Sequence, residues 1–378
     1  MKKQILMGLG LLAALSFTAC SSSKEDVNSN LESLEQSTLK DEATKIMIPT
    51  YETLVARANE LKAAIEKFKS TPSKETLDAA RSAWRNARLP WEQSEAFLFG
   101  PTGDNGIDPA LDSWPVDVSA MNDVLNGTQS ITAESLAVNN DARGFHLVEY
   151  LLWGESGNKS YDVFTPRQME YLLAASEDIC NNAKKLVTYW TPYAEKLASA
   201  GDPGNVTYPS FDAAFQQLVM GMIDISNEVG NEKIENPLNG KDEDDQHKDN
   251  QPHPDLEESR FSHNSKTDYI NNIESVANVY EGKLNGKNYK GVSQVVVAIA
   301  KEKNNNALLE LNNQIIKQIA VAQKAISNIP GTFTDAIKAD NAAGRKAVKL
   351  AQKEVGLLNE LLLKLNGMAF NAAPPTEE

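Results

Sequence analysis

The chain has 378 residues, 41% of them hydrophobic, with 37 basic and 52 acidic side chains and a formal net charge of −15. A chain this acidic repels the phosphates of nucleic acids and anionic membrane surfaces, so a nucleic-acid-binding function is excluded from the expectations. The length is sufficient for two domains of ordinary size.

The N-terminus has the layout of a signal peptide. Two lysines precede an apolar run over residues 5–17 that is too short to span a bilayer, and small residues then lead to Cys20. This pattern resembles a lipobox. It predicts removal of residues 1–19, a lipid on Cys20 that anchors the protein to the outer membrane, and a flexible tether over residues 20–38. The periplasmic and the surface-exposed face both remain open, and an ordinary secretory signal with an unrelated cysteine is the alternative.

The rest of the chain has a helical pattern nearly everywhere. Apolar residues recur three and four positions apart, and alternation of period two is hard to find beyond Val295–Val297, which lies within a helical pattern. Thr71–Pro72 and Thr165–Pro166 each place a capping residue before a proline at a helix start. Cys180 lies on an apolar stretch and is expected to be a buried small hydrophobe.

Breaks in this pattern divide the chain. The richest in glycine and proline covers residues 200–210. The sequence predicts an all-α fold with two helix-bundle domains, 39–202 and 203–372, packed side by side with a cleft between them. The second bundle carries an acidic insertion at 239–256, interpreted as solvated.

A charged stripe runs along the predicted helix at 81–95. Its charges stand at positions 81, 85, 88, 92 and 95, three and four apart, and therefore share one face. Trp84 and Trp91 form a second stripe, and Pro90 interrupts the backbone bonding of the helix. The stripe is either part of a site or a solvated face beside a tryptophan core.

The segment Gly144–Gly154 is apolar almost all the way round, which indicates a buried helix. His146 and Glu149, three positions apart, share one of its faces. A buried carboxylate without a partner is costly, so a metal, an arginine or a hydroxyl must face the pair. A structural histidine in the core is the simpler alternative, since this spacing is common on helices.

A third polar segment, Glu257–Asn264, combines charges, hydroxyls, a histidine and an amide. It either contributes to a ligand site or caps the helix that follows near Asp268.

These segments together resemble the imelysin-like family. The blocks that carry the resemblance are W-x-x-A-R-x-x-W-E-x-x-E-x-F-x-F-G from Trp84 to Gly100, the stretch 108–117 with Trp114, the G-x-H-x-x-E motif from Gly144, and 258–264. They occur in register over most of the chain after the signal peptide. The resemblance implies a helical fold of two bundles with a site between them, in an exported protein often linked to iron acquisition.

The resemblance also implies the site residues. His146, Glu149, Glu92 and Glu95 are the expected metal ligands, and the residues expected to line the cleft are Arg88, Trp114, Arg260 and Ser262. The expected cofactor is a divalent metal ion, Fe or Zn, since one imidazole with carboxylate oxygens suits these ions. Iron-transport proteins are the expected partners, together with the membrane that holds the anchor.

Three functions remain open from the sequence. The first is metal binding in iron acquisition, and the second is a surface binding module for a small molecule or a protein, without metal. The third is a zinc peptidase, after the activity for which the family was named. Zinc peptidases usually place two histidines on one helix, but Tyr150 follows Glu149 here, so His263 would have to reach the site.

Overall fold

A computed structural model describes residues 24–138, 142–240 and 250–370. The signal peptide, Cys20 and the centre of the acidic insertion lie outside the described residues. In the part that is described, nearly all regular structure is helical, and no helix combines the length and apolar character needed to cross a bilayer. The protein is therefore all-α, as predicted.

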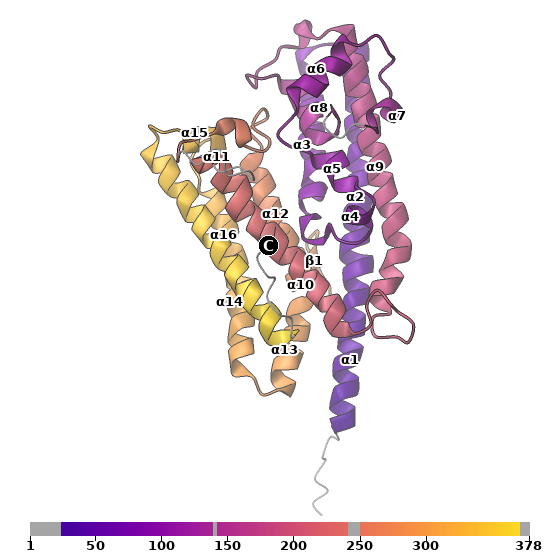
Figure 1. The fold of residues 1–378 in the computed structure, drawn as a ribbon, viewed down its shortest axis with the longest axis vertical. Coiled ribbons are helices and arrows are strands. Elements are labelled where there is room, and N and C mark those ends of the chain that lie inside the picture. The colour runs from indigo at the N-terminus through magenta and orange to yellow at the C-terminus, as the bar shows by residue number, and fades with distance from the viewer. Residues whose placement is uncertain (1–23, 139–141, 241–249, 371–378) are drawn as a thin grey trace, which may run out of the picture.

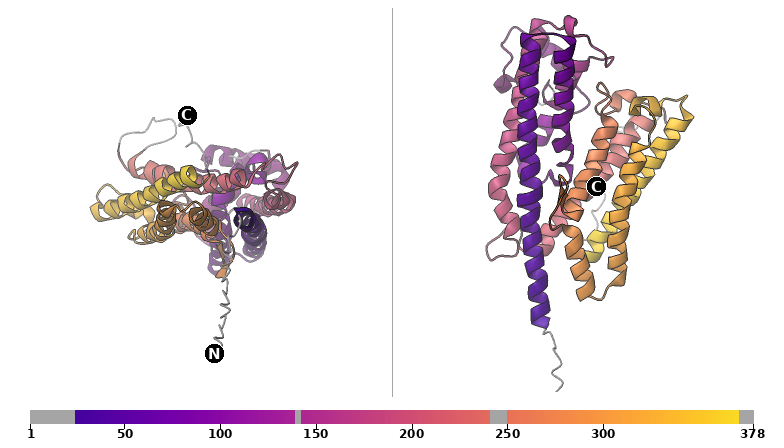
Figure 2. Two further views of the ribbon diagram at one scale, coloured as in Figure 1. Left: turned by 90° about the horizontal axis from the view of Figure 1, so that it is seen from below. Right: turned by 180° about the vertical axis from the view of Figure 1, so that it is seen from behind.

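The first bundle is built around three long helices, α2, α3 and α9. The π-helix η1 joins α1 to α2, so that the three form one continuous column, with α9 packed alongside (Figures 1 and 2). Short helices connect the long ones and cover one face. Its elements are α1 (Lys24–Asp41), η1 (Glu42–Met47), α2 (Ile48–Ser70), α3 (Lys74–Glu92), η2 (Glu95–Phe97), α4 (Pro101–Asp104), α5 (Ile107–Asp112), α6 (Val118–Asn126), α7 (Ala133–Leu136), α8 (Gly144–Trp153), η4 (Tyr161–Val163) and α9 (Pro166–Ala198).

The second bundle packs α10, α12, α14 and α16 together. A short antiparallel hairpin, with Lys283 paired to Asn288, separates α12 from α13. Its elements are α10 (Phe211–Glu228), η5 (Val229–Ile234, a π-helix), α11 (Glu235–Asn239), η6 (Pro254–Leu256), α12 (Ser265–Glu281), β1 (Lys283–Leu284), β2 (Lys287–Asn288), α13 (Val292–Glu302), α14 (Asn306–Ser327), α15 (Phe333–Ile337) and α16 (Ala342–Ala369).

Most of the local predictions, for helix caps and for residues 295–297, are confirmed. Thr165 caps α9, whose first residue is Pro166, and Val295–Val297 lies within α13. The cap of α3 is Ser73, not Thr71, because the hydroxyls of Ser73 and Thr76 cap each other's backbone N–H groups. Cys180 is buried, as expected.

Residues 24–38 form most of helix α1, so the prediction of a flexible tether across 20–38 was wrong over this range. Leu31 and Leu34 lie on the core, and Thr38 and Leu39 are fully buried. These positions follow helical spacing, so α1 has an apolar face that packs against α9 and α13. The polar composition of its other face had suggested a linker.

The two bundles lie side by side (Figure 1), and α12 of the second packs against α3 and η2 of the first. Hydrogen bonds cross this contact: Gln93 donates to Asn271, and the backbone N–H of Ala96 donates to Ser275. The packing brings together the C-terminal half of α3, the end of α5, the start of α8, and the loop 257–264 that precedes α12.

Candidate metal centre between the helical bundles

The charged stripe of α3 faces inward at its C-terminal half. Arg88 and Glu92 have no exposed surface, and the helix continues through Pro90 to Glu92. The alternative of a solvated face is therefore wrong for these two residues. Trp84 and Trp91 are fully buried as well, so the tryptophan stripe and the C-terminal half of the charged stripe both lie in the interior.

Arg88 is the central cation of the cluster. Its guanidinium forms ion pairs with Glu92 and Asp112, donates to Glu258 Oε1 at 2.9 Å, and lies 3.8 Å from Asp268 Oδ2. Burial lowers the pKa of Arg88, but the four carboxylates outweigh this effect and keep its pKa above the ordinary value. Arg88 thus remains charged in the interior and joins α3 and α5 to the loop and helix of the second bundle.

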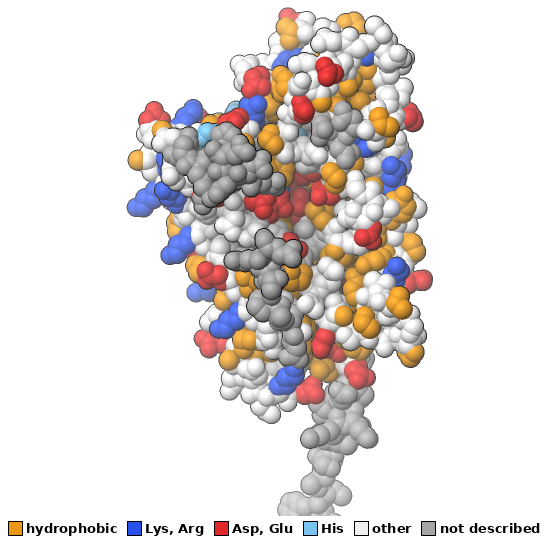
Figure 3. Space-filling model, viewed as in Figure 1, with side chains coloured by type: hydrophobic (Ala, Val, Ile, Leu, Met, Phe, Trp, Pro, Cys, Tyr) orange, Lys and Arg blue, Asp and Glu red, His pale blue; other side chains and the backbone are white. Residues whose placement is uncertain are grey.

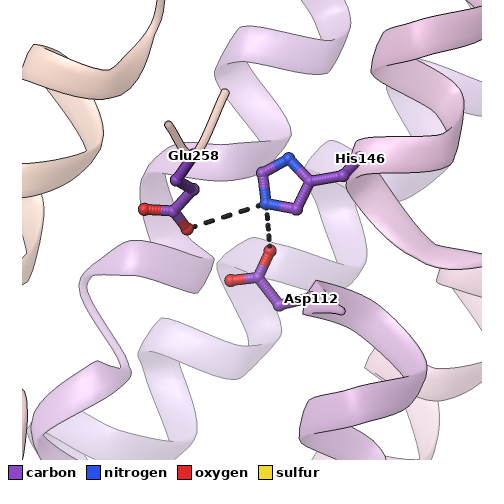
Figure 4. A group of neighbouring side chains, drawn as sticks. All are labelled: Asp112, His146 and Glu258. Carbon is purple, nitrogen blue, oxygen red and sulfur yellow. Dashed lines mark ion pairs between the residues drawn. The ribbon is translucent and has the colours of Figure 1, made fainter. Parts of the chain in front are cut away.

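His146 stands at the start of α8 and uses both ring nitrogens. Its Nδ1 lies 3.1 Å from Glu149 Oε2, and its Nε2 lies 3.0 Å from Asp112 Oδ1 and 3.6 Å from Glu258 Oε1 (Figure 4). The Nε2 atom is buried and has no partner with hydrogen-bond geometry among the described residues. The imidazole therefore directs one nitrogen at two carboxylates from different parts of the fold.

Gly144 makes this approach possible. It has φ +85°, and a Cβ at this position would lie 2.6 Å from the carbonyl oxygen of Leu111. Only glycine combines this backbone angle with such a close approach. The glycine of the G-x-H-x-x-E motif therefore lets α8 begin directly against the end of α5, where Asp112 stands.

Glu149 lies on the opposite side of the imidazole from Asp112 and Glu258. One of its oxygens contacts His146, and the other accepts the backbone N–H of Ser262 at 2.7 Å. The geometry thus gives Glu149 the role of orienting the ring, a typical partner of a ligating histidine. Ser262 contributes its backbone, which connects the loop of the second bundle to α8.

Of the remaining residues considered for the site, one lies beside the cluster and two lie at the surface. Trp114 lies beside the cluster, with Lys233 Nζ 5.2 Å from its ring centre. Arg260 instead pairs with the exposed Glu155 at the surface. His263 is exposed and contacts Thr334 at 3.4 Å, so the structure does not bring either Arg260 or His263 to the His146 group.

Four members of the cluster were missed as site residues: Asp112, Lys233, Glu258 and Asp268. Asp112, Glu258 and Asp268 lie in or beside segments that the sequence had singled out, but spacing along one helix cannot pair residues from different elements. No sequence pattern indicated that Lys233 belongs to the site. It lies in π-helix η5, is almost fully buried, and binds Glu228 and Glu258 at 3.2 Å each.

The cluster holds more acids than permanent cations. Among the described residues, two buried cations, Arg88 and Lys233, face six buried carboxyl groups: Glu92, Glu95, Asp112, Glu149, Glu258 and Asp268. Like-charged groups in a low-dielectric interior cannot all be ionised without further positive charge. Protons or a bound cation must supply it.

The acids divide into two classes. Burial raises the pKa values of Glu92 and Glu95 well above the ordinary value, which favours their protonated forms. Burial also raises the pKa values of Asp112 and Glu258, but nearby cations outweigh it. Arg88 holds the pKa of Asp112 well below its usual range, and Lys233 holds the pKa of Glu258 at about 2. The acids that face His146 Nε2 are therefore the ionised ones.

The surroundings of His146 favour its protonated form. Burial and Arg88 lower its pKa, but its contacts with Asp112, Glu149 and Glu258 outweigh them and raise the pKa well above the ordinary value. A cation that binds Nε2 would displace this proton.

An acidic pocket of about 380 Å³ opens beside the cluster between the two bundles (Figure 3). Its wall includes Trp114 and Pro115. Its acidic lining residues are Glu95, Asp108, Asp112, Glu228 and Glu232. The pocket thus connects the surface to Asp112.

The residues present fit a metal ion. The ligand atoms of Asp112, His146 and Glu258 lie within 4.8 Å of one another, and so do those of Glu92, Glu95 and Asp112. One imidazole with two carboxylates suits Fe or Zn. The unsatisfied Nε2 and the excess of carboxyl groups are both features that a cation would resolve.

Comparisons with known proteins agree with this fold. The model of a peptidase family described as Imelysin matches residues 47–362. Iron-regulated protein A of Synechococcus elongatus is 28% identical over 368 residues, which is 95% of this chain and 92% of that protein.

Two solved structures are similar over most of the chain. A protein described as an iron-regulated protein A precursor from Parabacteroides distasonis superposes with a TM-score of 0.70 at 26% identity, covering 88% of this chain and 95% of that one. An imelysin-like protein from Psychrobacter arcticum has a TM-score of 0.68 at 16% identity, with 89% and 97% covered, and shares the fold.

Proposed function

Because the chain belongs to the imelysin family, we propose that it binds a metal ion between its two bundles and serves iron acquisition at the cell envelope. The name of the Synechococcus relative, iron-regulated protein A, supports the iron-related role. One observation carries the metal proposal: the buried Nε2 of His146 faces Asp112 and Glu258 without a hydrogen bond.

The residues around this group would hold the cation in place. Asp112, His146 and Glu258 offer one nitrogen and two oxygen ligands, drawn from both bundles. Glu149 accepts the Nδ1 proton, which leaves Nε2 as the ligand atom, and Ser262 fixes Glu149 from the second bundle. A bound ion would supply the positive charge that the cluster lacks.

Arg88 and Lys233 neutralise part of the acid charge in the absence of cargo. Because both contact Glu258, an arriving cation competes with them for this carboxylate. The site is therefore suited to reversible binding, in which protons and side-chain contacts exchange with the metal.

The peptidase alternative is less well supported. It required His263 to supply the second imidazole, and this side chain is exposed beside Thr334. Among the described residues, the cluster contains one histidine, His146, and so it lacks the second imidazole that zinc peptidases usually place at the metal. The binding-module alternative predicts no metal affinity, so the experiment below separates it from the proposal.

Calorimetric titration of the purified protein with Zn²⁺, and with Fe²⁺ under anaerobic conditions, tests the metal site. We expect His146→Ala to lose binding and His263→Ala to retain it, since both remove one imidazole but only His146 faces the cluster. Equal affinities in the two variants would remove the proposal.

We also propose that Cys20 is lipidated and that the protein is anchored to the outer membrane, where iron-transport proteins are its partners. The signal-peptide layout supports this anchor, and α1 begins four residues after Cys20. Mass spectrometry of the N-terminal peptide from membrane-extracted protein tests it: a diacylglyceryl mass on Cys20 is expected, and an unmodified thiol at this position would refute it.

A further inference from the structure

Glu95 differs from the other acids of the cluster. Its side chain is only 6% exposed, and it lines the acidic pocket from the 3-10 helix η2. Among the described residues, its carboxyl group accepts no hydrogen bond and forms no ion pair. A carboxyl group this buried, without a hydrogen-bond partner and facing a pocket, needs either a proton or a ligand from the pocket.

Two other carboxylates meet Glu95 at the floor of the pocket. Ligand atoms of Glu92, Glu95 and Asp112 lie within 4.8 Å of one another. Each of the other two is oriented by a neighbour: Asn272 donates to Glu92 Oε2 at 2.5 Å, and the indole of Trp91 donates to Asp112 Oδ2 at 2.6 Å. The floor therefore presents three oxygen ligands, of which two are held in place.

We propose that Glu92, Glu95 and Asp112 form a second cation subsite, built only from carboxylate oxygens, that takes a hydrated divalent or trivalent cation from the acidic pocket. It shares Asp112 with the His146 subsite. This inference rests on the proposed metal-binding function and extends it to two adjoining positions.

The ligand chemistry defines the class of cation. Oxygen-only sites favour hard ions such as Mg²⁺, Mn²⁺, Ca²⁺ and Fe³⁺, whereas the subsite with an imidazole favours Zn²⁺ and Fe²⁺. The lining of the pocket also selects the form of the ion. Its acids, Glu95, Asp108, Asp112, Glu228 and Glu232, repel chelates with a net negative charge. The cargo thus enters as an aqua ion.

Terbium(III) is a suitable probe because it is a hard ion and its luminescence is excited by nearby tryptophans. Trp114 lines the pocket and Trp91 contacts Asp112, so both stand close to the proposed subsite. We expect Glu95→Gln to weaken terbium binding by about tenfold or more and to leave zinc binding unchanged. His146→Ala is expected to have the reverse effect.

Glu52→Gln is the matched control, because Glu52 is an exposed carboxylate on α2, and it should bind both ions as the wild type does. Circular dichroism and thermal melting establish that each variant is folded. Glu95→Asp, which withdraws the carboxylate by one methylene, provides the same test with the charge retained.

The outcomes separate the two proposals. Wild-type terbium binding in folded Glu95→Gln and Glu95→Asp would overturn the second subsite and leave the His146 site standing. Loss of both ions in Glu95→Gln would show one shared site and overturn the division into two. Zinc binding that survives His146→Ala would overturn the proposed function itself. Luminescence that persists in excess citrate would refute entry as an aqua ion.

Discussion

The Nε2 atom of His146 lies 3.0 Å from Oδ1 of Asp112, and this contact joins the first turn of α8 to the last residue of α5. The two residues are far apart in sequence, and the contact depends on the close approach of the two helices at Gly144. Substitutions at and around this contact therefore test the proposed site.

Gly144→Ala should destabilise the protein. The added methyl group would meet the carbonyl oxygen of Leu111 at 2.6 Å on a backbone with φ +85°. We expect the free energy of unfolding in urea to fall by about 1–3 kcal/mol. The control is Gly356→Ala, on α16, where nothing lies within 4 Å and alanine favours the helix. Equal effects of the two substitutions would contradict the role given to Gly144.

Asp112→Asn and Glu149→Gln should affect metal binding to different extents. Asp112 faces the ligand nitrogen, so its substitution should reduce zinc affinity below detection by calorimetry. Glu149 orients the ring from behind, so Glu149→Gln should weaken affinity by about 10- to 100-fold. The reverse order would place the ion between His146 and Glu149 instead of between His146 and Asp112.

Arg88→Met should be strongly destabilising. It removes the guanidinium that contacts Glu92, Asp112 and Glu258 and leaves their charges in the interior without compensation. Breaking a buried pair in this way costs about 3–5 kcal/mol, which urea unfolding would measure. Arg57→Met, at an exposed pair on α2, should change stability by less than about 0.5 kcal/mol. A comparable loss at both positions would show that the buried network contributes nothing special.

Stability should fall as pH rises from 5 to 7.5. Burial raises the pKa of Glu257 to about 7, that of Asp268 to about 6, and that of Glu42 well above 4.5. Up to its own folded-state pKa, each of these groups holds a proton that the unfolded state has released, and each such proton lowers the free energy of unfolding by about 1.4 kcal/mol per pH unit. Urea titrations at a series of pH values measure this slope.

Carboxyl groups whose pKa is lowered by folding have the opposite effect on stability, and they titrate below pH 5. The pKa of Glu258 is held at about 2, mainly by Lys233 against the effect of burial, so the stability it contributes is lost only in strong acid. Glu42→Gln should flatten the slope, because both carboxyl oxygens of Glu42 are buried without hydrogen-bond partners. Stability that increases between pH 5 and 7.5 would contradict this account.

The sequence was sufficient for the fold class and for part of the site. Helical periodicity indicated the long helices, and the His146 and Glu149 pair was correctly placed in the interior. Periodicity describes one helix at a time, however. It could not show that Asp112 and Glu258 converge on His146, or that a π-helix turns Lys233 inward.

The wrong predictions for individual residues also have physical explanations. Arg260 and Ser262 are neighbours in one loop, but Arg260 finds Glu155 at the surface while the backbone of Ser262 turns toward Glu149. A segment of mixed polarity does not reveal which of its groups point inward. The polar face of α1 similarly concealed Leu39 and the packing surface around it.

The guanidinium of Arg88 gives the interior a permanent counter-ion that belongs to the polypeptide itself. A protein whose acids are neutralised only by cargo collapses or unfolds when the cargo leaves, as small zinc-dependent domains do. Here Arg88 joins the two bundles through Asp112 of the first and Glu258 of the second without any cation, so the proposed loading and unloading would need no refolding. Under the proposed function, such a molecule would bind and release a cation repeatedly, and its occupancy would follow the concentration of ions outside.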